Sequence, residues 1–127
     1  MKAITVRQPW ASLIVAAAKD IENRTWSTRY RGPLLIHAAS AAARPAAWQE
    51  ARALCARLGI PLPTDLPRGG VIGVADLVDC VIDHESPWFE GPFGFVLARA
   101  RALPFAPCAG ALSLWTPLNG KSLIHVA

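Results

Sequence analysis

The spacing of apolar side chains predicts two helices in the first half of the chain. A helix is expected from Pro9 to about Lys19, because proline suits a first helical position and apolar residues recur there with the 3.6-residue period: Trp10, Leu13, Ile14, Ala17 and Ala18. A second helix is predicted over Pro45–Leu58, with an apolar stripe on one side and Gly59 as its stop signal.

Six further segments have the apolar, β-branched or alternating character of strands. They are Lys2–Val6, Ile21–Trp26, Leu34–Ala38, Val71–Ile82, Phe93–Leu103 and Leu112–Trp115. Proline and glycine predict loops or turns over Gly59–Gly70 and Pro104–Gly110.

The longest of these segments, Val71–Ile82, fixes the expected architecture. Both of its faces are apolar, interrupted only by Asp76 and Asp79. A strand that is apolar on both sides needs cover on both sides. We therefore predict an α+β protein built as a small β-barrel with two main helices at its side.

Length and composition limit the class of protein. The 127 residues suit one domain spanning 1–127, and 53% hydrophobic against 17% charged residues argues against a disordered chain. The longest apolar run, Leu13–Ala18, is too short to cross a membrane, and the first residues lack the apolar block of a signal peptide. We expect a cytoplasmic monomer without membrane contacts.

Known motifs for cofactors and metals do not occur in the sequence. There is no P-loop, dinucleotide fingerprint or metalloprotease helix. The three cysteines, Cys55, Cys80 and Cys108, are widely spaced and are expected to be reduced core thiols. We expect neither a cofactor nor a metal ion.

Charge is distributed unevenly along the chain. Its net value is +4, and the basic residues gather in the first half, through Arg57. This excess suggests a polyanionic partner or a substrate that carries phosphate.

The most informative stretch runs from Lys19 to Trp26. On an extended strand Glu22, Arg24 and Trp26 would share one face, and Lys19 could reach it from the preceding helix. A lysine held near a carboxylate can carry a proton or anchor an anion. The alternative is a surface ion pair of Glu22 with Arg24 that only stiffens the strand.

The adjoining stretch, residues 24–31, interleaves arginines with aromatic and hydroxyl side chains. Arg24, Arg29 and Arg31 suit phosphate, and Trp26 and Tyr30 could stack on bases. This composition is typical of a surface that binds single-stranded nucleic acid. A solvated loop with Trp26 in the core is an equally good interpretation.

Two isolated polar residues lie in apolar segments. Asp76 needs a cation or hydrogen-bond donors, so it should either point into the cleft of Lys19 or cap a neighbouring loop, the structural role being favoured. His37 ends an apolar strand and is expected to be a satisfied core or rim imidazole, because no second ligand stands at metal-site spacing.

Several ordered motifs together resemble the ASCH family. They are Val6–Ile14, the pattern Lys19-x-x-Glu22-x-Arg24-x-Trp26, Arg31–Ala38, Gly73–Cys80, Phe93–Leu97 and Leu114–Trp115. The resemblance implies a PUA-like barrel with a cleft at Lys19, Glu22 and Arg24, and a role in RNA metabolism. Ala17 stands where the family's pattern usually has glycine, which a helical approach to Lys19 would tolerate.

One branch of the family hydrolyses N4-acetylcytidine with a lysine, a threonine three residues later and a distant glutamate. Lys19 matches the lysine, but Glu22 occupies the threonine position, and Thr25 would face the other way on a strand. The match to this branch therefore covers the lysine and not the threonine.

Three hypotheses follow. The first is a module that binds RNA or a nucleoside, with Lys19 and the arginines at phosphate, Trp26 or Tyr30 against a base, and Glu22 at a base amino group. The second is a hydrolase using the same cleft on a modified nucleoside or on single-stranded RNA, with Lys19 and Glu22 exchanging a proton. The third is a protein-interaction domain with a merely solubilising basic face.

Overall fold

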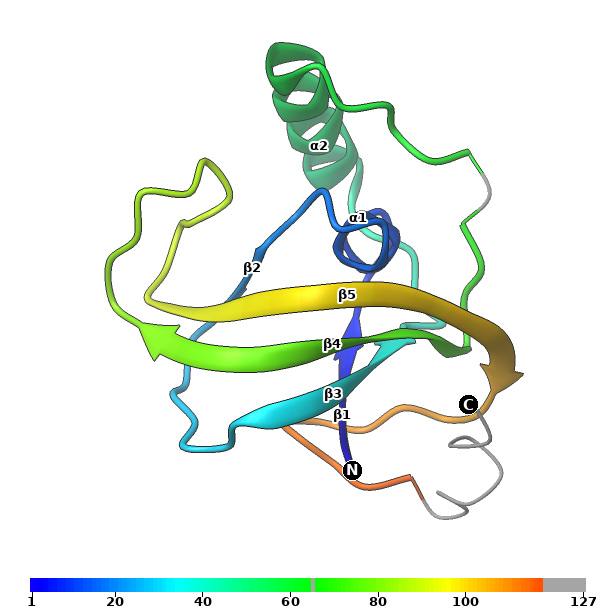
Figure 1. Ribbon diagram of the computed structural model, residues 1–127. Coiled ribbons are helices and arrows are strands. Elements are labelled where there is room, and N and C mark those ends of the chain that lie inside the picture. Colours follow the sequence, from blue (N-terminus) through cyan, green and yellow to red (C-terminus); the bar gives the residue numbers. More distant parts are fainter. Residues whose placement is uncertain (65, 118–127) are drawn as a thin grey trace.

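The structure is a computed structural model, and it describes residues 1–64 and 66–117. In this part of the chain a curled five-stranded sheet encloses helix α1 and carries helix α2 at its side (Figure 1). The elements are β1 (Lys2–Val6), α1 (Trp10–Val15), β2 (Ile21–Arg24), β3 (Gly32–Ala38), α2 (Pro45–Leu58), β4 (Gly70–Val81) and β5 (Phe93–Pro107). The predicted α+β, PUA-like barrel with two helices is confirmed.

The sheet is ordered β1-β3-β4-β5-β2. β1 runs parallel to β3, and the other neighbouring strands are antiparallel. The long strands β4 and β5 carry three register shifts against each other, and such bulges increase the local twist. The twist brings the edge strands β1 and β2 near each other, and the Arg24 side chain of β2 donates a hydrogen bond to the Thr5 carbonyl of β1 at 2.7 Å.

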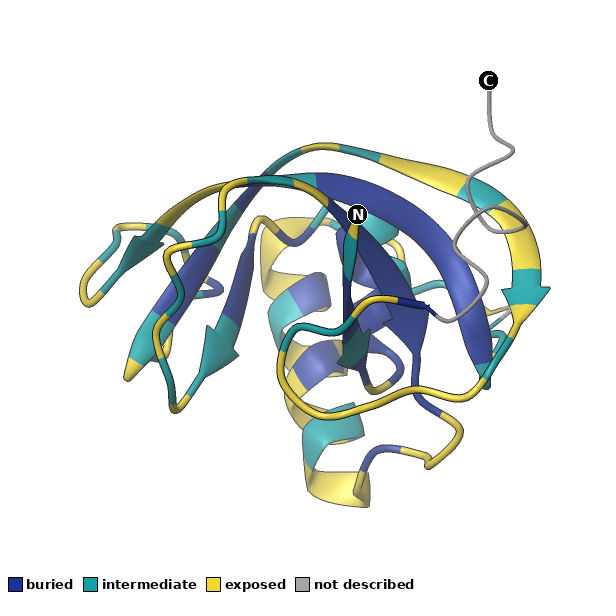
Figure 2. Ribbon diagram, turned by 90° about the horizontal axis from the view of Figure 1, so that it is seen from below, coloured by how far each residue is buried: buried dark blue, intermediate teal, exposed yellow. Residues whose placement is uncertain are grey.

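Helix α1 lies against the concave face of the sheet, where the buried residues concentrate (Figure 2). Ala11 and Ile14 of α1 belong to the same core cluster as Ile36 and Phe95 of the sheet. The approach is close at Gly73 of β4, where an added Cβ would lie 2.5 Å from a methyl carbon of Val15. The predicted apolar stripe of the first helix therefore faces the barrel interior.

Helix α2 packs through a second cluster on the outer side of α1. Its Leu54 and Cys55 contact Leu13 of α1, Ile21 of β2 and Trp88 of the loop between β4 and β5. The helix begins and ends where the sequence predicts, with Gly59 in the left-handed region at φ 70°. This packing places α2 across from β2 and the 82–92 loop.

Helix α1 is shorter than predicted. It ends at Val15, because the N–H groups of Ala17 and Ala18 bond back to the carbonyls of Ile14 and Leu13. These bonds form a Schellman motif, whose C′ residue must adopt a left-handed conformation. Ala17 does so at φ 62°. The expectation that a helix continues to Lys19 was wrong: Ala17 occupies a turn that favours glycine.

The end of the chain also differs from the prediction. β5 continues to Pro107, so the turn expected over Pro104–Gly110 begins only after the strand. Leu112–Trp115 forms no strand in the described residues. It contributes one antiparallel bridge, between Ala3 and Trp115, because the backbone of Trp115 pairs with the outer edge of β1 at a single residue.

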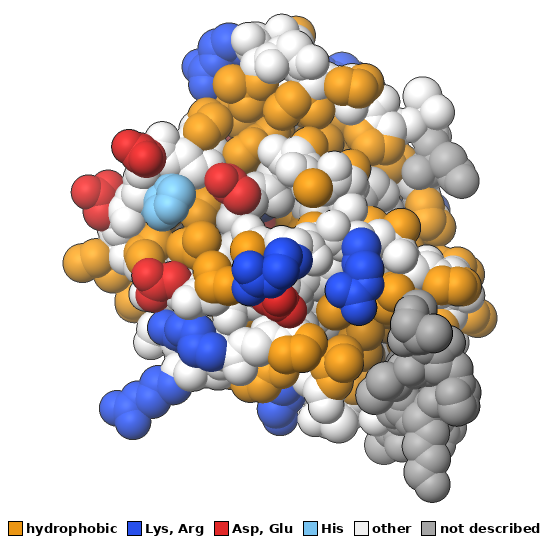
Figure 3. Space-filling view, viewed as in Figure 1, with side chains coloured by type: hydrophobic (Ala, Val, Ile, Leu, Met, Phe, Trp, Pro, Cys, Tyr) orange, Lys and Arg blue, Asp and Glu red, His pale blue; other side chains and the backbone are white. Residues whose placement is uncertain are grey.

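Asp76 occupies neither of the two predicted positions. Its carboxylate pairs with Arg99 of the neighbouring strand, with Oδ2 2.6 Å from Nε. Both side chains are open to solvent, with 31% of Asp76 and 68% of Arg99 exposed. On the face of the protein seen in Figure 3, basic and acidic side chains lie next to each other. A cross-strand cation thus compensates this carboxylate, as in other charged pairs on sheet faces.

His37 is satisfied at one nitrogen only. Its Nε2 lies 2.7 Å from the Cys108 carbonyl, and its ring contacts Trp115 edge-on. Its Nδ1 is buried without a hydrogen-bond partner among the described residues. The expectation that His37 is a core imidazole is confirmed. The expectation that both of its ring nitrogens have hydrogen-bond partners is not.

The three cysteines are free. Cys55 is buried in the core and matches the expectation, whereas Cys80 and Cys108 are only half-buried. Burial raises the pKa of the Cys55 thiol above its ordinary value.

Candidate functional site

A pocket of about 240 Å³ lies where the end of α1, strand β2, helix α2 and the 82–92 loop meet. Most of the lining side chains are aromatic or ionisable: Trp10, Lys19, Glu22, Glu50, Trp88 and Glu90. Asn23, Ala47, Leu54 and Pro87 complete the lining. Its volume is near the lower end of ligand pockets, which span roughly 300–1,000 Å³. It therefore suits one ring or head group of a larger ligand.

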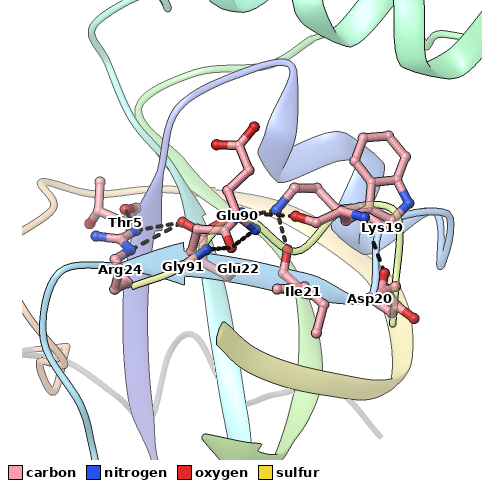
Figure 4. A network of polar contacts seen from close by, with 11 residues as sticks. Thr5, Lys19, Asp20, Ile21, Glu22, Arg24, Glu90 and Gly91 are labelled. Atoms are coloured by element: carbon pink, nitrogen blue, oxygen red, sulfur yellow. Dashed lines mark hydrogen bonds and ion pairs between the residues drawn. The ribbon is translucent and has the colours of Figure 1, made fainter. Parts of the chain in front are cut away.

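Lys19, Glu22 and Arg24 form one connected ion-pair network at this pocket (Figure 4). Lys19 Nζ lies 3.1 Å from Glu22 Oε1. The guanidinium of Arg24 approaches the other oxygen, Oε2, with Nη2 at 3.0 Å and Nε at 3.1 Å. Since Glu22 is only 8% exposed, the interpretation of a surface ion pair does not hold for this carboxylate.

Lys19 is buried, at 5% exposure, and two of its three N–H donors are engaged within the described part of the chain. It donates to the Ile21 carbonyl and to Glu22. The ammonium also lies 5.8 Å from the centre of the Trp10 ring, within the range of a cation–π contact. An ammonium carries three donors, so one N–H remains for a ligand in the pocket.

The Schellman turn explains how Lys19 reaches this position. The Leu13 carbonyl accepts the N–H of Lys19 at 3.0 Å as well as that of Ala18. The chain therefore reverses directly after α1 and enters β2, which holds Glu22 three residues later. A continuous helix through Lys19 would have pointed its side chain elsewhere.

Asn23 attaches the 82–92 loop to β2. Its side-chain oxygen accepts the backbone N–H groups of Glu90 and Gly91, at 2.8 and 3.0 Å, and its side-chain nitrogen donates to the Trp88 carbonyl at 2.9 Å. These bonds fix Trp88 and Glu90 in the pocket wall. Sequence reasoning missed this role, because the partners are more than 60 residues apart.

Glu50 and Glu90 were also missed, and they bring two more carboxyl groups to the pocket. The carboxyl of Glu90 hydrogen-bonds that of Glu50, and this bond raises the pKa of Glu50 to about 7, together with burial and the charge of Glu90. Lys19 acts in the opposite direction. The available signal was the helical spacing of Ala47, Glu50 and Leu54, which puts them on one face. No local pattern indicates Glu90.

A shallower groove continues from the pocket across β1 and β2. Thr5, Arg7, Trp10, Arg24 and Trp26 line a hollow of about 380 Å³, and a neighbouring hollow adds Arg44 beside Arg7 and Glu50. The Trp26 ring stands edge-on to Phe95, with ring centres 5.1 Å apart. Trp26 therefore packs on the core and also lines the groove.

The three predicted residues of the 29–31 turn lie apart from this pocket and groove. Arg31 donates to carbonyls of its own turn and pairs with Asp79 at 3.6 Å. Tyr30 packs against the core and donates to the Pro33 carbonyl. Arg29 is exposed. A role of these residues in binding stays a prediction.

Within residues 1–64 and 66–117, no group of three or more His, Cys, Asp or Glu side chains is arranged to hold a metal ion. No helix in this part of the chain has the length and apolar character needed to cross a membrane.

The fold and the site define a PUA-like barrel with a lysine–glutamate–arginine cluster beside an aromatic pocket. The family model of the ASCH domain matches residues 4–95, so the chain belongs to the ASCH family. The matched region contains most of β1, all of the elements from α1 to β4, and every residue that lines the pocket.

Two curated relatives are similar to this chain. Activating signal cointegrator 1 of Homo sapiens is 31% identical over 124 residues, which cover 88% of this chain and 21% of that protein. Activating signal cointegrator 1 of Mus musculus is 37% identical over 81 residues, which cover 61% of this chain and 14% of that protein. The chain thus spans about a fifth or less of the length of these relatives.

Proposed function

We propose that this protein is a binding module for single-stranded RNA or a modified nucleoside, with one base in the pocket and the phosphates along the groove. The observation that carries the proposal is a buried ammonium with a spare donor, in a pocket lined by two tryptophans and next to arginine-lined hollows. The resemblance of the fold to RNA-binding PUA and YTH-type modules supports it. The family assignment supports it as well.

The residues take separate roles in this proposal. Lys19 donates to an acceptor on the base, and Glu22 holds both Lys19 and Arg24 in place. Trp26 offers a stacking surface in the groove, and such contacts contribute about 1–3 kcal/mol per base. Arg7 and Arg24 meet phosphate there, and Arg29, Tyr30 and Arg31 stay a predicted second contact on a surface apart from the groove.

The test is a fluorescence titration of single-stranded RNA at several salt concentrations. The logarithm of affinity should fall linearly with that of salt, with a slope of about −0.7 per phosphate contacted. Arg7→Gln should weaken binding and reduce this slope by about 0.7. Arg101→Gln, which removes an exposed arginine of β5 outside the groove, is the matched control and should change neither.

Three results would overturn the proposal: no binding, binding that is indifferent to salt, or equal effects of the two arginine variants. The first two would instead favour a protein-interaction domain whose basic residues only increase solubility.

A hydrolase is the second candidate function. The observation in its favour is the 3.1 Å contact of Lys19 Nζ with Glu22 inside a pocket, since proton exchange requires such a distance. Arg24 would stabilise negative charge that develops on the substrate. Thr25 is exposed beyond the end of β2, so a hydroxyl does not take the place of Glu22.

This activity is tested with N4-acetylcytidine and with labelled single-stranded RNA. Product should form with the wild-type protein and not with Lys19→Ala or the bulkier Lys19→Met. Turnover that survives both substitutions would exclude Lys19 as the catalytic base. Absence of turnover in the wild type would refute the hydrolase and leave binding as the remaining proposed function.

A further inference from the structure

The pocket carries a pair of carboxyl groups that the proposed function leaves unused. We infer that Glu50 and Glu90 select a nucleobase with an exocyclic amino group, adenine or cytosine, against uracil. This inference rests on the proposed function, because it assumes that a base enters the pocket.

The two side chains come from opposite walls. Glu50 stands on α2, and Glu90 on the loop that Asn23 attaches to β2. The Glu90 side chain extends from this loop toward α2 (Figure 4). Both carboxyl groups line the pocket and are open to solvent, and an ionised carboxylate only accepts hydrogen bonds. The pair therefore forms an acceptor-rich edge across the pocket from Lys19.

Charged groups around Glu50 come from every neighbouring element. Lys19 and Glu22 lie with it and Glu90 in the pocket, and Arg7 and Arg44 border it in the adjoining hollow. Lys19 and Glu22 already form an ion pair. The remaining negative charge inside the pocket is that of the Glu50–Glu90 pair, which favours a ligand that donates hydrogen bonds.

A base with an amino group matches this arrangement at three points. Its amino hydrogens face the carboxyl pair, an adjacent ring nitrogen accepts from the spare N–H of Lys19, and its flat ring packs against the wall that Trp10 and Trp88 form, with their rings edge-on and 6.3 Å apart. Adenine and cytosine carry amino donors where uracil, like thymine, carries a carbonyl oxygen. In uracil that oxygen would face the carboxylates, and the repulsion would weaken binding.

The raised pKa of Glu50 makes this selectivity depend on pH. An amino donor binds ionised carboxylates, so its binding requires Glu50 to release the proton that it holds below about pH 7. Because the pKa of Glu50 is raised to about 7, affinity for an amino-bearing base should rise between pH 6 and pH 8. The factor cannot exceed tenfold per pH unit for one proton.

The experiment compares oligo(A), oligo(C) and oligo(U) RNA of equal length with 5′-hydroxyl ends, because a terminal phosphate would titrate near pH 6. Affinities are measured at pH 6 and pH 8 for the wild type, Glu50→Gln and Glu90→Gln. Glu85→Gln, at an exposed glutamate of the same loop outside the pocket, is the matched control. Because every variant is measured with the same RNAs, self-structure of the RNA affects all affinities equally and cancels when variants are compared.

The wild type and Glu85→Gln should bind oligo(A) or oligo(C) about 3- to 10-fold more tightly than oligo(U), as expected for one or two hydrogen bonds. This preference should increase several-fold from pH 6 to pH 8. Glu50→Gln and Glu90→Gln should reduce it below about twofold and remove its pH dependence.

Each other outcome is decisive. Equal binding of the three RNAs would overturn this inference and leave the proposed function intact, as would a preference that persists in both pocket variants. No binding of any RNA would overturn the proposed function, and this inference with it.

Discussion

The left-handed turn at Ala17 makes a sharp prediction, because two neighbouring alanines should respond to the same substitution with opposite signs. Ala17 has φ 62° and Ala16 has φ −74°, and both are exposed. A left-handed conformation costs a residue with a Cβ roughly 1–2 kcal/mol, a cost that glycine avoids. Ala17→Gly removes this strain without disturbing any packed side chain.

The net gain is smaller than the strain, because glycine also has more freedom in the unfolded chain. That term amounts to about 0.4–1 kcal/mol. Ala17→Gly should therefore raise the free energy of unfolding by about 0.5–1 kcal/mol and the midpoint temperature by about 2–4 °C. Ala16→Gly relieves no strain and should lower the free energy of unfolding by about 0.5–1 kcal/mol.

Urea unfolding followed by tryptophan fluorescence measures both changes, since Trp10, the first residue of α1, and Trp88 pack in one cluster with Leu13 of that helix. The midpoints should move in opposite directions at an unchanged slope against urea. If both variants lose stability to the same extent, Ala17 is not left-handed in solution. The account of how Lys19 is positioned would then be wrong.

Three further substitutions test other parts of the structure. Arg24→Lys should lower the free energy of unfolding by about 2 kcal/mol in urea, because lysine cannot reach both Glu22 and the Thr5 carbonyl; an unchanged midpoint would contradict the bridge between the sheet edges. Gly73→Ala should cost about 1–3 kcal/mol, since its Cβ would lie 2.5 Å from a Val15 methyl of α1 and 2.6 Å from the Arg101 carbonyl of β5. A neutral result would show that both neighbours lie farther from β4. The raised pKa of Glu50 means that the folded protein holds a proton that the unfolded chain releases above about pH 4.5, so stability should fall from pH 4.5 to about 7. Glu50→Gln should flatten this decline in a pH series of thermal melts, and an equally steep decline in the variant would refute the assignment.

The fold could be predicted to a large extent because its strands and helices follow local patterns. The two-sided apolar run of β4 indicated a closed barrel, and the stripe and glycine stop of α2 gave its bounds. The end of α1 could not be found this way. Ala17 and Ala18 continue the apolar period of the helix, while the Schellman turn depends on backbone bonds that alanine does not signal.

The site was predictable only where its residues are neighbours in the sequence. Lys19, Glu22, Arg24 and Trp26 belong to one short stretch, and strand alternation groups three of them. Glu90 reaches the pocket through bonds to Asn23, and no periodicity links residues so far apart. The arginines at 29 and 31 share the composition of the site but follow the turn after β2, which takes them to another surface.

Glu22 contributes both to the candidate site and to the stability of the fold. One of its oxygens holds the ammonium that faces the ligand, and the other holds the guanidinium that bridges the open seam between the first and second strands. An engineer who wants to change the ligand preference of such a domain would therefore substitute pocket residues of α2 and of the loop after β4. Glu22 and its two cationic partners would have to be kept.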